Sequence, residues 1–288
     1  MSRKNPEYDF KWCPGCGDFG VRRALEIAMA DRIKRTGIPM ENNVVIAGIG
    51  CSGNLVHVLE GPQPYGFHGI HGRTLPIALG VKMARPELNV LIVAGDGDFL
   101  SIGMEHIAPQ AARNLNVTAV IMDNAVYGLT KGQSSPTTEL GDKTSSTPYG
   151  KLEDALDPLD LYLTFGVSFI AGGFSSQPKE LASMIGAAMD HPGFAIVHIQ
   201  SPCTTYNDTY DELKGDPEKN IAPLIYQVPK DHDTSSREAA YKIIHSKGVP
   251  LGIIYKDTSR SSLDQRLAEL QQKVQVKSTE ELVAVFKV

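Results

Sequence analysis

Residues 91–98 have the sequence LIVAGDGD, an apolar run that ends abruptly in a Gly-Asp-Gly-Asp turn. A second apolar run, residues 117–122, ends in Asp123 and Asn124. The interval between the two runs is long enough for a helix, which predicts a βαβ unit with parallel strands. The carboxyl ends of parallel strands meet at one edge of a sheet, where open α/β folds bind ligands. We therefore expect Asp96 and Asn124 to lie close together.

The oxygen-bearing side chains at this edge suit a metal-bound phosphate group. Carboxylate and amide oxygens are the hard ligands that Mg²⁺ prefers, and glycines allow backbone N–H groups to approach a phosphate closely. Gly95-Asp96-Gly97 alone is equally consistent with a tight turn. The additional Asn124, one helical crossover later, shifts the interpretation towards a magnesium-bound diphosphate.

The chain alternates between strand-like and helix-like patterns. Strands are expected at residues 43–49, 91–95, 117–122, 168–171 and 194–200, and helices at residues 19–34, 75–84, 103–115, 158–165 and 177–191. This alternation predicts an α/β fold with a doubly wound, mostly parallel sheet. The polar stretch 130–151 is too long for a simple connection, which indicates a lid or a partner-contacting segment.

Two regions are expected along the chain. Residues 1–204 form a ligand-binding domain with an N-terminal arm that carries a CxxC pair, and residues 205–288 form a C-terminal extension. The extension is polar, with helical patches near residues 235–245 and 261–273. We expect it to pack on the first region or on a partner subunit.

The bulk composition excludes nucleic-acid binding and membrane spanning as main functions. The 288 residues carry a formal net charge of −5, so there is no basic excess. No apolar run reaches the roughly 18 residues that a membrane span requires. Residues 1–8 are polar and lack the apolar segment of a signal peptide. A cytoplasmic location is expected, with thiols that stay reduced unless they bind a metal.

Four cysteines are candidates for one shared metal site. Cys13 and Cys16 form a CxxC pair, whereas Cys51 and Cys203 each follow the end of an expected parallel strand. All four can therefore converge at the sheet edge that carries Asp96. Four thiolates suit an iron–sulfur cluster or a zinc ion. Structural zinc usually takes two local pairs, so the spacing favours the cluster over zinc and over unrelated thiols.

Three further motifs have competing interpretations. Residues 12–16, WCPGC, are similar to a thioredoxin-like redox pair but do not follow a convincing strand. Residues 48–53, GIGCSG, match GxGxxG, but no acidic residue follows about 20 positions later to hold a ribose. Residues 71–74, HGRT, suit a phosphate or carboxylate clamp at a helix start. A capped helix with a solvated arginine is an equal alternative for the last motif.

Gly95-Asp96-Gly97, followed by Asp123-Asn124, resembles the thiamine diphosphate motif, which begins with GDG and usually ends with NN. Asp123 replaces the first of these asparagines, and Asn124 matches the second, which is the metal ligand in the family. With the four cysteines included, residues 12–203 are similar to the β subunit of the 2-oxoacid:ferredoxin oxidoreductases. The combination is far more specific than either motif alone.

The resemblance implies three sets of cofactor ligands. Magnesium would be held by Asp96, Asn124 and the main-chain carbonyl of Val126. Thiamine diphosphate would be contacted by Ile49, Gly50, Cys51, Ser52, His71, Gly72, Arg73, Thr74, Gly97, Asp98, Gly128 and Leu129. One [4Fe–4S] cluster would be held by Cys13, Cys16, Cys51 and Cys203, with Cys51 linking the two cofactors.

The resemblance also implies a reaction and partners. Family members decarboxylate a 2-oxoacid oxidatively, transfer the acyl group to coenzyme A and pass electrons to ferredoxin. This chain looks closest to those that convert 2-oxoglutarate to succinyl-coenzyme A, a reaction that can be reversed to fix CO₂. The activating Glu would come from an α subunit in an αβ or α₂β₂ enzyme, so no catalytic residue is assigned to this chain.

Three alternatives to this function stay open at the level of the sequence. The substrate can be pyruvate or a broad range of 2-oxoacids. The chain can be a subunit of a non-oxidative thiamine decarboxylase, which leaves the cysteines without a role. It can also be a zinc-stabilised binding protein that does not bind thiamine.

Overall fold

A single twisted sheet forms the centre of the protein, seen here in a computed structural model that describes residues 12–62, 64–274 and 277–286. The sheet has eight strands in the order β2-β1-β3-β4-β8-β7-β10-β9. The strands are β1 Asn43–Ala47, β2 Tyr65–His68, β3 Asn89–Gly95, β4 Val117–Asp123, β7 Phe169–Phe174, β8 Phe194–Gln200, β9 Ile225–Gln227 and β10 Val249–Lys256. Neighbours are parallel except for β10, which runs antiparallel to β7. The predicted mostly parallel sheet is confirmed.

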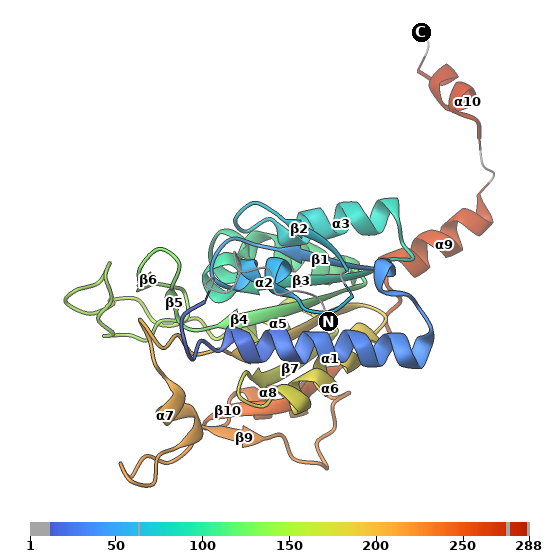
Figure 1. Cartoon of the computed structure of the whole chain (residues 1–288). Helices are drawn as coiled ribbons and strands as arrows, with labels where there is room; N and C mark the ends of the chain where they lie inside the picture. The colour runs from blue at the N-terminus through green and yellow to red at the C-terminus, as the bar shows by residue number, and fades with distance from the viewer. Residues whose placement is uncertain (1–11, 63, 275–276, 287–288) are drawn as a thin grey trace.

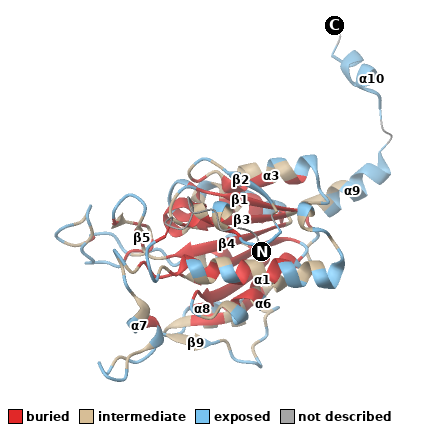
Figure 2. Cartoon of the chain, in the orientation of Figure 1, coloured by how far each residue is buried: buried red, intermediate tan, exposed pale blue. Residues whose placement is uncertain are grey.

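Helices cover both faces of the sheet, which gives a three-layer α/β/α arrangement (Figure 1). One face carries α1 Asp18–Thr36, α2 Leu55–Val58 and α6 Pro178–Met189; the other carries α3 Thr74–Ala84, α4 Ile107–Arg113, α5 Pro158–Phe165 and α8 Arg237–Ile244. Alternate residues of each central strand enter the two cores. Ile92 of β3, for example, packs under one layer and Leu91 under the other. The central strands β3 and β4 are accordingly buried along most of their length (Figure 2).

The helix boundaries follow from local chemistry. Helix α1 ends at Gly37, whose left-handed φ of 71° allows its N–H group to bond to Ile33. Helix α5 begins after Asp157, whose carboxylate accepts two backbone N–H groups at the N-terminus. The predicted helix at 103–115 is shorter than expected. It starts at Ile107, so Pro109 falls in the first turn, where its missing N–H group costs nothing.

The sequence patterns missed three strands of the eight-stranded sheet, as well as the short hairpin strands β5 Val126–Tyr127 and β6 Gln133–Ser134. Strand β2 lies in the stretch 60–74, expected to be a loop, and strands β9 and β10 lie in the polar C-terminal extension. The extension therefore contributes to the same sheet before it continues into α9 Leu263–Lys273 and α10 Thr279–Ala284, which reach away from the body of the protein (Figure 1). Among the helices that the structure describes, none has the length and apolarity needed to cross a membrane.

Candidate functional site

One cleft collects loops that follow the carboxyl ends of four neighbouring strands, β2, β1, β3 and β4. The loop after β3 brings Asp96, and the loop after β4 brings Asn124, whose backbone N–H group lies 3.5 Å from Asp96 Oδ1. The predicted convergence of these two residues is confirmed. The cleft is lined by Ile49, Gly50, Cys51, Ser52, His71, Gly95, Asp96, Gly97, Asp98, Asn124, Val126, Tyr127, Gly128, Leu129 and Thr130.

Asp96 and Asp123 are buried side by side and share a hydroxyl group. Thr137 Oγ1 lies 2.9 Å from Asp96 Oδ2 and 2.8 Å from Asp123 Oδ1. Burial, and then the charge of Asp123, raise the pKa of Asp96 to about 7. A divalent cation bound to Asp96 would relieve both effects, because it favours the ionised carboxylate. The buried pair of acids therefore fits a cation site.

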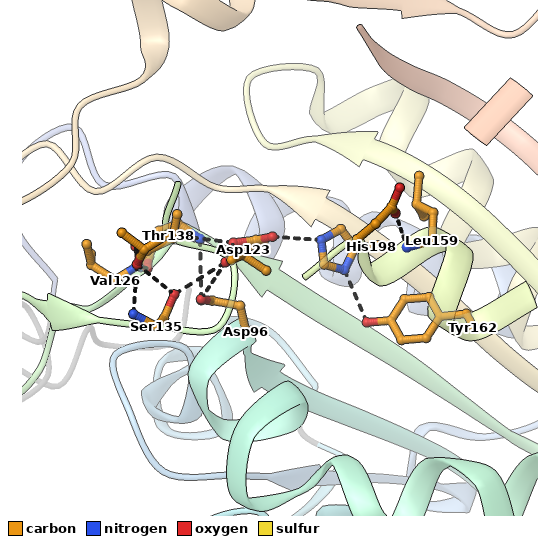
Figure 3. Close-up of polar contacts among 12 residues, drawn as sticks. Asp96, Asp123, Val126, Ser135, Thr138, Leu159, Tyr162 and His198 are labelled. Atoms are coloured by element: carbon orange, nitrogen blue, oxygen red, sulfur yellow. Dashed lines mark hydrogen bonds and ion pairs between the residues drawn. The ribbon is translucent and has the colours of Figure 1, made fainter. Parts of the chain in front are cut away.

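Asp123 is the first member of a buried series of hydrogen-bonded side chains behind the cleft. Its Oδ2 lies 2.9 Å from His198 Nε2, and His198 Nδ1 lies 3.2 Å from the hydroxyl oxygen of Tyr162 (Figure 3). Residues from three distant segments, Thr137, His198 and, through His198, Tyr162, thus fix the carboxylate that stands next to Asp96. The sequence patterns gave no sign of this network, because His198 comes from β8 and Thr137 from the long loop after β6 (Gln133–Ser134).

The turn after β4 holds the other oxygen donors that the sequence predicted as metal ligands. Asn124 Oδ1 accepts a hydrogen bond from the N–H group of Val126 at 3.1 Å, and Ala125 adopts a left-handed φ of 56°. Thr138 Oγ1 donates to the Ala125 carbonyl at 2.6 Å, which stabilises this strained residue. An amide oxygen keeps a second lone pair after one hydrogen bond. The Asn124 side chain and the Val126 carbonyl, with Asp96, thus provide a donor set that suits Mg²⁺.

Asp98 forms hydrogen bonds to two of the loops that line the cleft. Its Oδ1 accepts hydrogen bonds from the backbone N–H groups of Ile49 and Gly72, both at 2.9 Å. Burial raises the pKa of Asp98, and these two donors oppose that effect. A side chain at Gly48 would place its Cβ 2.0 Å from Asp98 Oδ2, so only glycine fits there. Asp98 therefore positions the loops that follow β1 and β2.

Gly48→Ala is expected to weaken binding of thiamine diphosphate by about tenfold, because the new methyl group displaces Asp98 and releases both loops. Gly80→Ala is a matched control. Its Cβ would meet nothing within 4 Å, and alanine is the better helix former in α3. Titration of Mg²⁺ and thiamine diphosphate, followed by intrinsic fluorescence, measures both variants. Equal affinity of Gly48→Ala and the wild-type protein would count against the role of Asp98.

Part of the predicted clamp at residues 71–74 points away from the cleft. His71 lines it, but the Arg73 guanidinium donates to the Ile102 carbonyl at 2.7 Å and lies 3.4 Å from Glu105. Thr74 is buried at the start of α3. The cofactor contacts predicted for Arg73 and Thr74 stay predictions, and Arg73 has a structural role in this conformation. Tyr127, which the sequence did not suggest, donates its hydroxyl to the Gly97 carbonyl at 3.1 Å and forms part of the lining.

The cysteines meet the cleft at Gly128. A Cβ placed on Gly128 would lie 3.5 Å from Cys51 Sγ and 3.7 Å from Cys203 Sγ. Burial is the main cause that raises the pKa of Cys51 to about 12, and Cys203 and Cys13 contribute to it. Burial also raises the pKa of Cys16, to which Cys51 and Cys203 add. The four thiols are therefore near neighbours, as the spacing predicted.

Four thiols are the donor set of an iron–sulfur cluster or of a zinc ion. Within the described residues, which include all four cysteines, no three His, Cys, Asp or Glu side chains are arranged to hold one metal ion. A zinc ion needs each sulfur at about 2.3 Å from one atom, whereas in a [4Fe–4S] cluster each thiolate binds a different iron. The four cysteines match in number the thiolates that one [4Fe–4S] cluster takes.

Hydrogen bonds from distant residues hold the CxxC arm over the sheet edge. Trp12 Nε1 donates to the Cys51 carbonyl at 2.8 Å, and the Gly17 N–H group donates to the Pro202 carbonyl at 3.1 Å. Thr204 and Tyr210 donate their hydroxyls to the carbonyls of residues 14 and 15 at 2.9 and 3.0 Å. The arm is thus fixed largely by the segment that leaves β8, and of these partners only Tyr210 lies in the region that the sequence interpretation assigned to the C-terminal extension.

Two buried acids should make the cofactor-free protein less stable as the pH rises. Burial raises the pKa of Asp18, beside the cysteines, to about 6, and that of Asp96 is raised to about 7. Between the unfolded value of 3.8 and these values the folded state binds more protons than the unfolded state, so the free energy of unfolding falls with increasing pH.

We expect the free energy of unfolding to be lower at about pH 8 than at about pH 5 by at least about 1 kcal/mol. Mg²⁺ with thiamine diphosphate should reduce the difference, because binding uses the ionised form of Asp96. Denaturant titrations at both pH values, with and without the cofactor, measure the effect. Replacing both acids by asparagine should flatten the dependence, and stability that increases with pH in the cofactor-free protein would contradict the prediction.

Two family descriptions match the chain in succession. The thiamine pyrophosphate enzyme C-terminal TPP-binding domain matches residues 48–199, which contain the loops with Asp96 and Asn124. The C-terminal region of the pyruvate ferredoxin oxidoreductase beta subunit matches residues 203–272, which contain Cys203 and the last strands of the sheet. All the residues that line the described cleft therefore lie within the first match.

Individual relatives agree with these families. The chain is 38% identical over 268 residues to subunit beta of 2-oxoacid:ferredoxin oxidoreductase 2 from Aeropyrum pernix. The aligned region covers 90% of this chain and 84% of the relative. It is 41% identical over 209 residues to the 2-oxoglutarate oxidoreductase subunit KorB from Mycobacterium tuberculosis, over 72% of this chain and 54% of the relative.

A solved structure has the same fold. It is that of the 2-oxoglutarate:ferredoxin oxidoreductase from Magnetococcus marinus with 2-oxoglutarate, coenzyme A and succinyl-CoA bound. It matches with a TM-score of 0.84 and 38% identity, over 96% of this chain and 92% of the neighbour. Both the sequence and the fold of the chain are therefore shared with enzyme subunits.

Proposed function

The chain belongs to the β subunits of the 2-oxoacid:ferredoxin oxidoreductases, and from this premise we propose that it forms the cofactor-binding half of an enzyme that acts on 2-oxoglutarate. The proposed reaction converts 2-oxoglutarate, coenzyme A and two oxidised ferredoxins to succinyl-coenzyme A, CO₂, a proton and two reduced ferredoxins. The observation that carries the proposal is the meeting of the acid–amide turn and the cysteines on either side of Gly128.

The residues of the cleft have distinct tasks in this reaction. Asp96, Asn124 and the Val126 carbonyl would hold Mg²⁺, and the glycines at positions 95 and 97 allow the diphosphate to approach the backbone. Bound thiamine diphosphate would supply the carbanion chemistry that releases the substrate carboxyl group as CO₂. Asp98 keeps the walls of the cleft in place through its bonds to residues 49 and 72.

The cysteines would provide the electron-transfer path from the cleft to ferredoxin. Ferredoxin accepts one electron at a time, whereas the oxidation releases two, so a one-electron carrier beside the cleft is needed. Cys13, Cys16, Cys51 and Cys203 would hold a [4Fe–4S] cluster in this position. Cys51 lines the cleft itself, so the distance between the reacting centre and the cluster would be short. Cys13 is exposed, so it would hold the cluster on a side that ferredoxin could approach.

An α subunit is proposed as the partner that completes the cleft. Large apolar side chains are exposed at its rim: Ile70 is 73% exposed, Ile102 is 45% exposed and Leu129 is 49% exposed. Such a group of apolar residues around a polar cleft is typical of a protein interface. The partner would cover the rim and supply the activating carboxylate, in an αβ or α₂β₂ enzyme.

The proposed substrate rests on the named relatives. KorB subunits from four organisms are 2-oxoglutarate enzymes by name, and the Magnetococcus marinus structure contains 2-oxoglutarate. Other relatives, from Aeropyrum pernix, are named only as 2-oxoacid enzymes, so pyruvate and a broad range of 2-oxoacids are the alternatives. The reaction can also run towards CO₂ fixation when a strongly reducing ferredoxin is supplied.

Co-expression with the α subunit and anaerobic assay test the proposal. Ferredoxin reduction should show its highest kcat/KM with 2-oxoglutarate and depend on coenzyme A, and the purified complex should contain about four irons per β chain. A preference for pyruvate would change the substrate but keep the enzyme class. Release of CO₂ without iron, coenzyme A or ferredoxin would instead identify a non-oxidative decarboxylase.

A further inference from the structure

Residues 201–210, here called the bridge segment, contact both halves of the site. On one side the segment contains Cys203 and holds the CxxC arm through Thr204 and Tyr210. On the other side its first residue, Ser201, donates its backbone N–H group to the Asp123 carbonyl at 2.7 Å. The segment is therefore the physical connection between the cysteine site and the turn with the metal ligands.

Within the bridge segment, Asn207 bonds directly to residues of both sites. Its backbone pairs with Cys203 in an isolated antiparallel bridge, with N–H···O distances of 2.9 Å and 3.2 Å. Its side-chain Nδ2 donates to the backbone carbonyl of Asn124 at 2.9 Å. One residue thus bonds directly to a cysteine of the cluster site and to a ligand residue of the magnesium site.

The Asn124 turn needs such support. Ala125 has a left-handed φ of 56°, a conformation that costs a non-glycine residue about 1 kcal/mol or more and persists only where its surroundings hold it. The bonds from Asn207 to the Asn124 carbonyl and from Thr138 to the Ala125 carbonyl fix the two peptide groups on either side of the turn. A displaced bridge segment would release the first of these bonds.

We propose that Asn207 is a positioning residue that couples occupancy of the cysteine site to the affinity of the magnesium–thiamine diphosphate site. The inference deepens the proposed function and rests on it. A cluster bound to Cys203 fixes the bridge segment, and the Asn207 amide transmits this order to the Asn124 turn. Coupling between two sites is reciprocal, so bound thiamine diphosphate also protects the cluster.

The forward test compares four species of the αβ complex: wild type and Asn207→Ala, each with its cluster and after removal of iron by a chelator. In the wild type, loss of the cluster should weaken binding of Mg²⁺–thiamine diphosphate about fivefold, the size expected for one hydrogen bond. Asn207→Ala with its cluster should show a similar loss. Removal of the cluster from this variant should then change the affinity by less than about twofold, because the hydrogen bond from residue 207 to the Asn124 carbonyl is already absent.

The reverse test needs no stripped protein. Thiamine diphosphate with Mg²⁺ should slow the loss of iron to a chelator in the wild type but not in Asn207→Ala. Thr205→Ala is the matched control, since Thr205 is an exposed residue of the same segment, and it should behave like the wild type. Asn207→Asp keeps the size and the backbone bridge but removes the donor. It serves as a second variant if Asn207→Ala does not assemble.

The outcomes separate this inference from the proposed function. If the wild type binds both cofactors, but Asn207→Ala retains its affinity and its protection of the cluster, Asn207 does not couple the sites. Independence of the two cofactors in the wild type overturns the inference as well. Failure of the wild-type complex to bind thiamine diphosphate or iron would overturn the proposed function itself.

Discussion

Asp96→Ala is expected to abolish retention of Mg²⁺ and thiamine diphosphate while the cysteine site keeps its iron. Asp96 is the only charged side chain in the proposed magnesium ligand set, and hard cations depend on charged oxygen ligands. Loss of an outer-shell partner of a metal typically costs 10–100-fold in affinity. Loss of this direct ligand should therefore weaken binding by at least about 100-fold. Equilibrium titration with thiamine diphosphate, together with iron analysis of the same samples, measures the two effects.

Stability distinguishes a loss of binding from a loss of folding. Burial and Asp123 raise the pKa of Asp96 in the cofactor-free protein, so its ionised form destabilises the fold. Asp96→Ala without cofactor should consequently unfold at the same temperature as the wild type, or higher, at about pH 8. Glu269→Ala, which removes an exposed acid of helix α9, should change neither affinity nor stability. Unchanged cofactor affinity in Asp96→Ala would remove this residue from the ligand set.

Asp123→Asn is the informative comparison, because it introduces the residue that the thiamine motif usually has at this position. The new side chain can still accept the hydroxyl of Thr137, but its charge no longer faces His198. We expect binding of Mg²⁺–thiamine diphosphate to stay within about tenfold of the wild type, as is typical for a change in the outer shell. A loss as large as that of Asp96→Ala would place Asp123 among the ligands.

The part of the site that could be predicted from the sequence is the part that lies directly after strands. Asp96, Asn124, Cys51 and Cys203 each follow an apolar run, and parallel strands bring all such positions to one edge. The apolar runs themselves are buried on both faces of the sheet, which makes them easy to recognise. The local sequence pattern and the parallel topology were sufficient to predict that these residues lie together.

The residues that could not be predicted act through contacts between distant segments. Thr137 reaches Asp96 from a loop, and Asn207 reaches Asn124 across 83 positions. No local pattern distinguishes these residues from ordinary polar surface residues. Strand β2 was missed because it lies at the exposed edge, and β10 because its burial is interrupted. Such elements gain their order from their neighbours rather than from their own sequence.

Cys203→Ser should remove the proposed cluster, although Cys203 is 152 or more positions from the other three cysteines in the sequence. Each iron of a [4Fe–4S] cluster takes one protein thiolate. The buried Cys203 lies against Gly128 beside Cys51, so no other described cysteine can replace it. Iron content should fall to less than about one quarter of the wild type, and the EPR signal of the reduced cluster should disappear.

The functional effect of Cys203→Ser separates the two possible uses of the thiamine site. If the cysteines carry electrons, ferredoxin reduction should fall by at least about 100-fold, whereas affinity for Mg²⁺–thiamine diphosphate should fall only about fivefold through the Asn207 link. Thr205→Ala again provides the control from the same segment. A variant that keeps its reduced-cluster signal would exclude Cys203 as a ligand. A variant that loses iron but reduces ferredoxin at the wild-type rate would show that the electrons leave by a route that does not involve these cysteines.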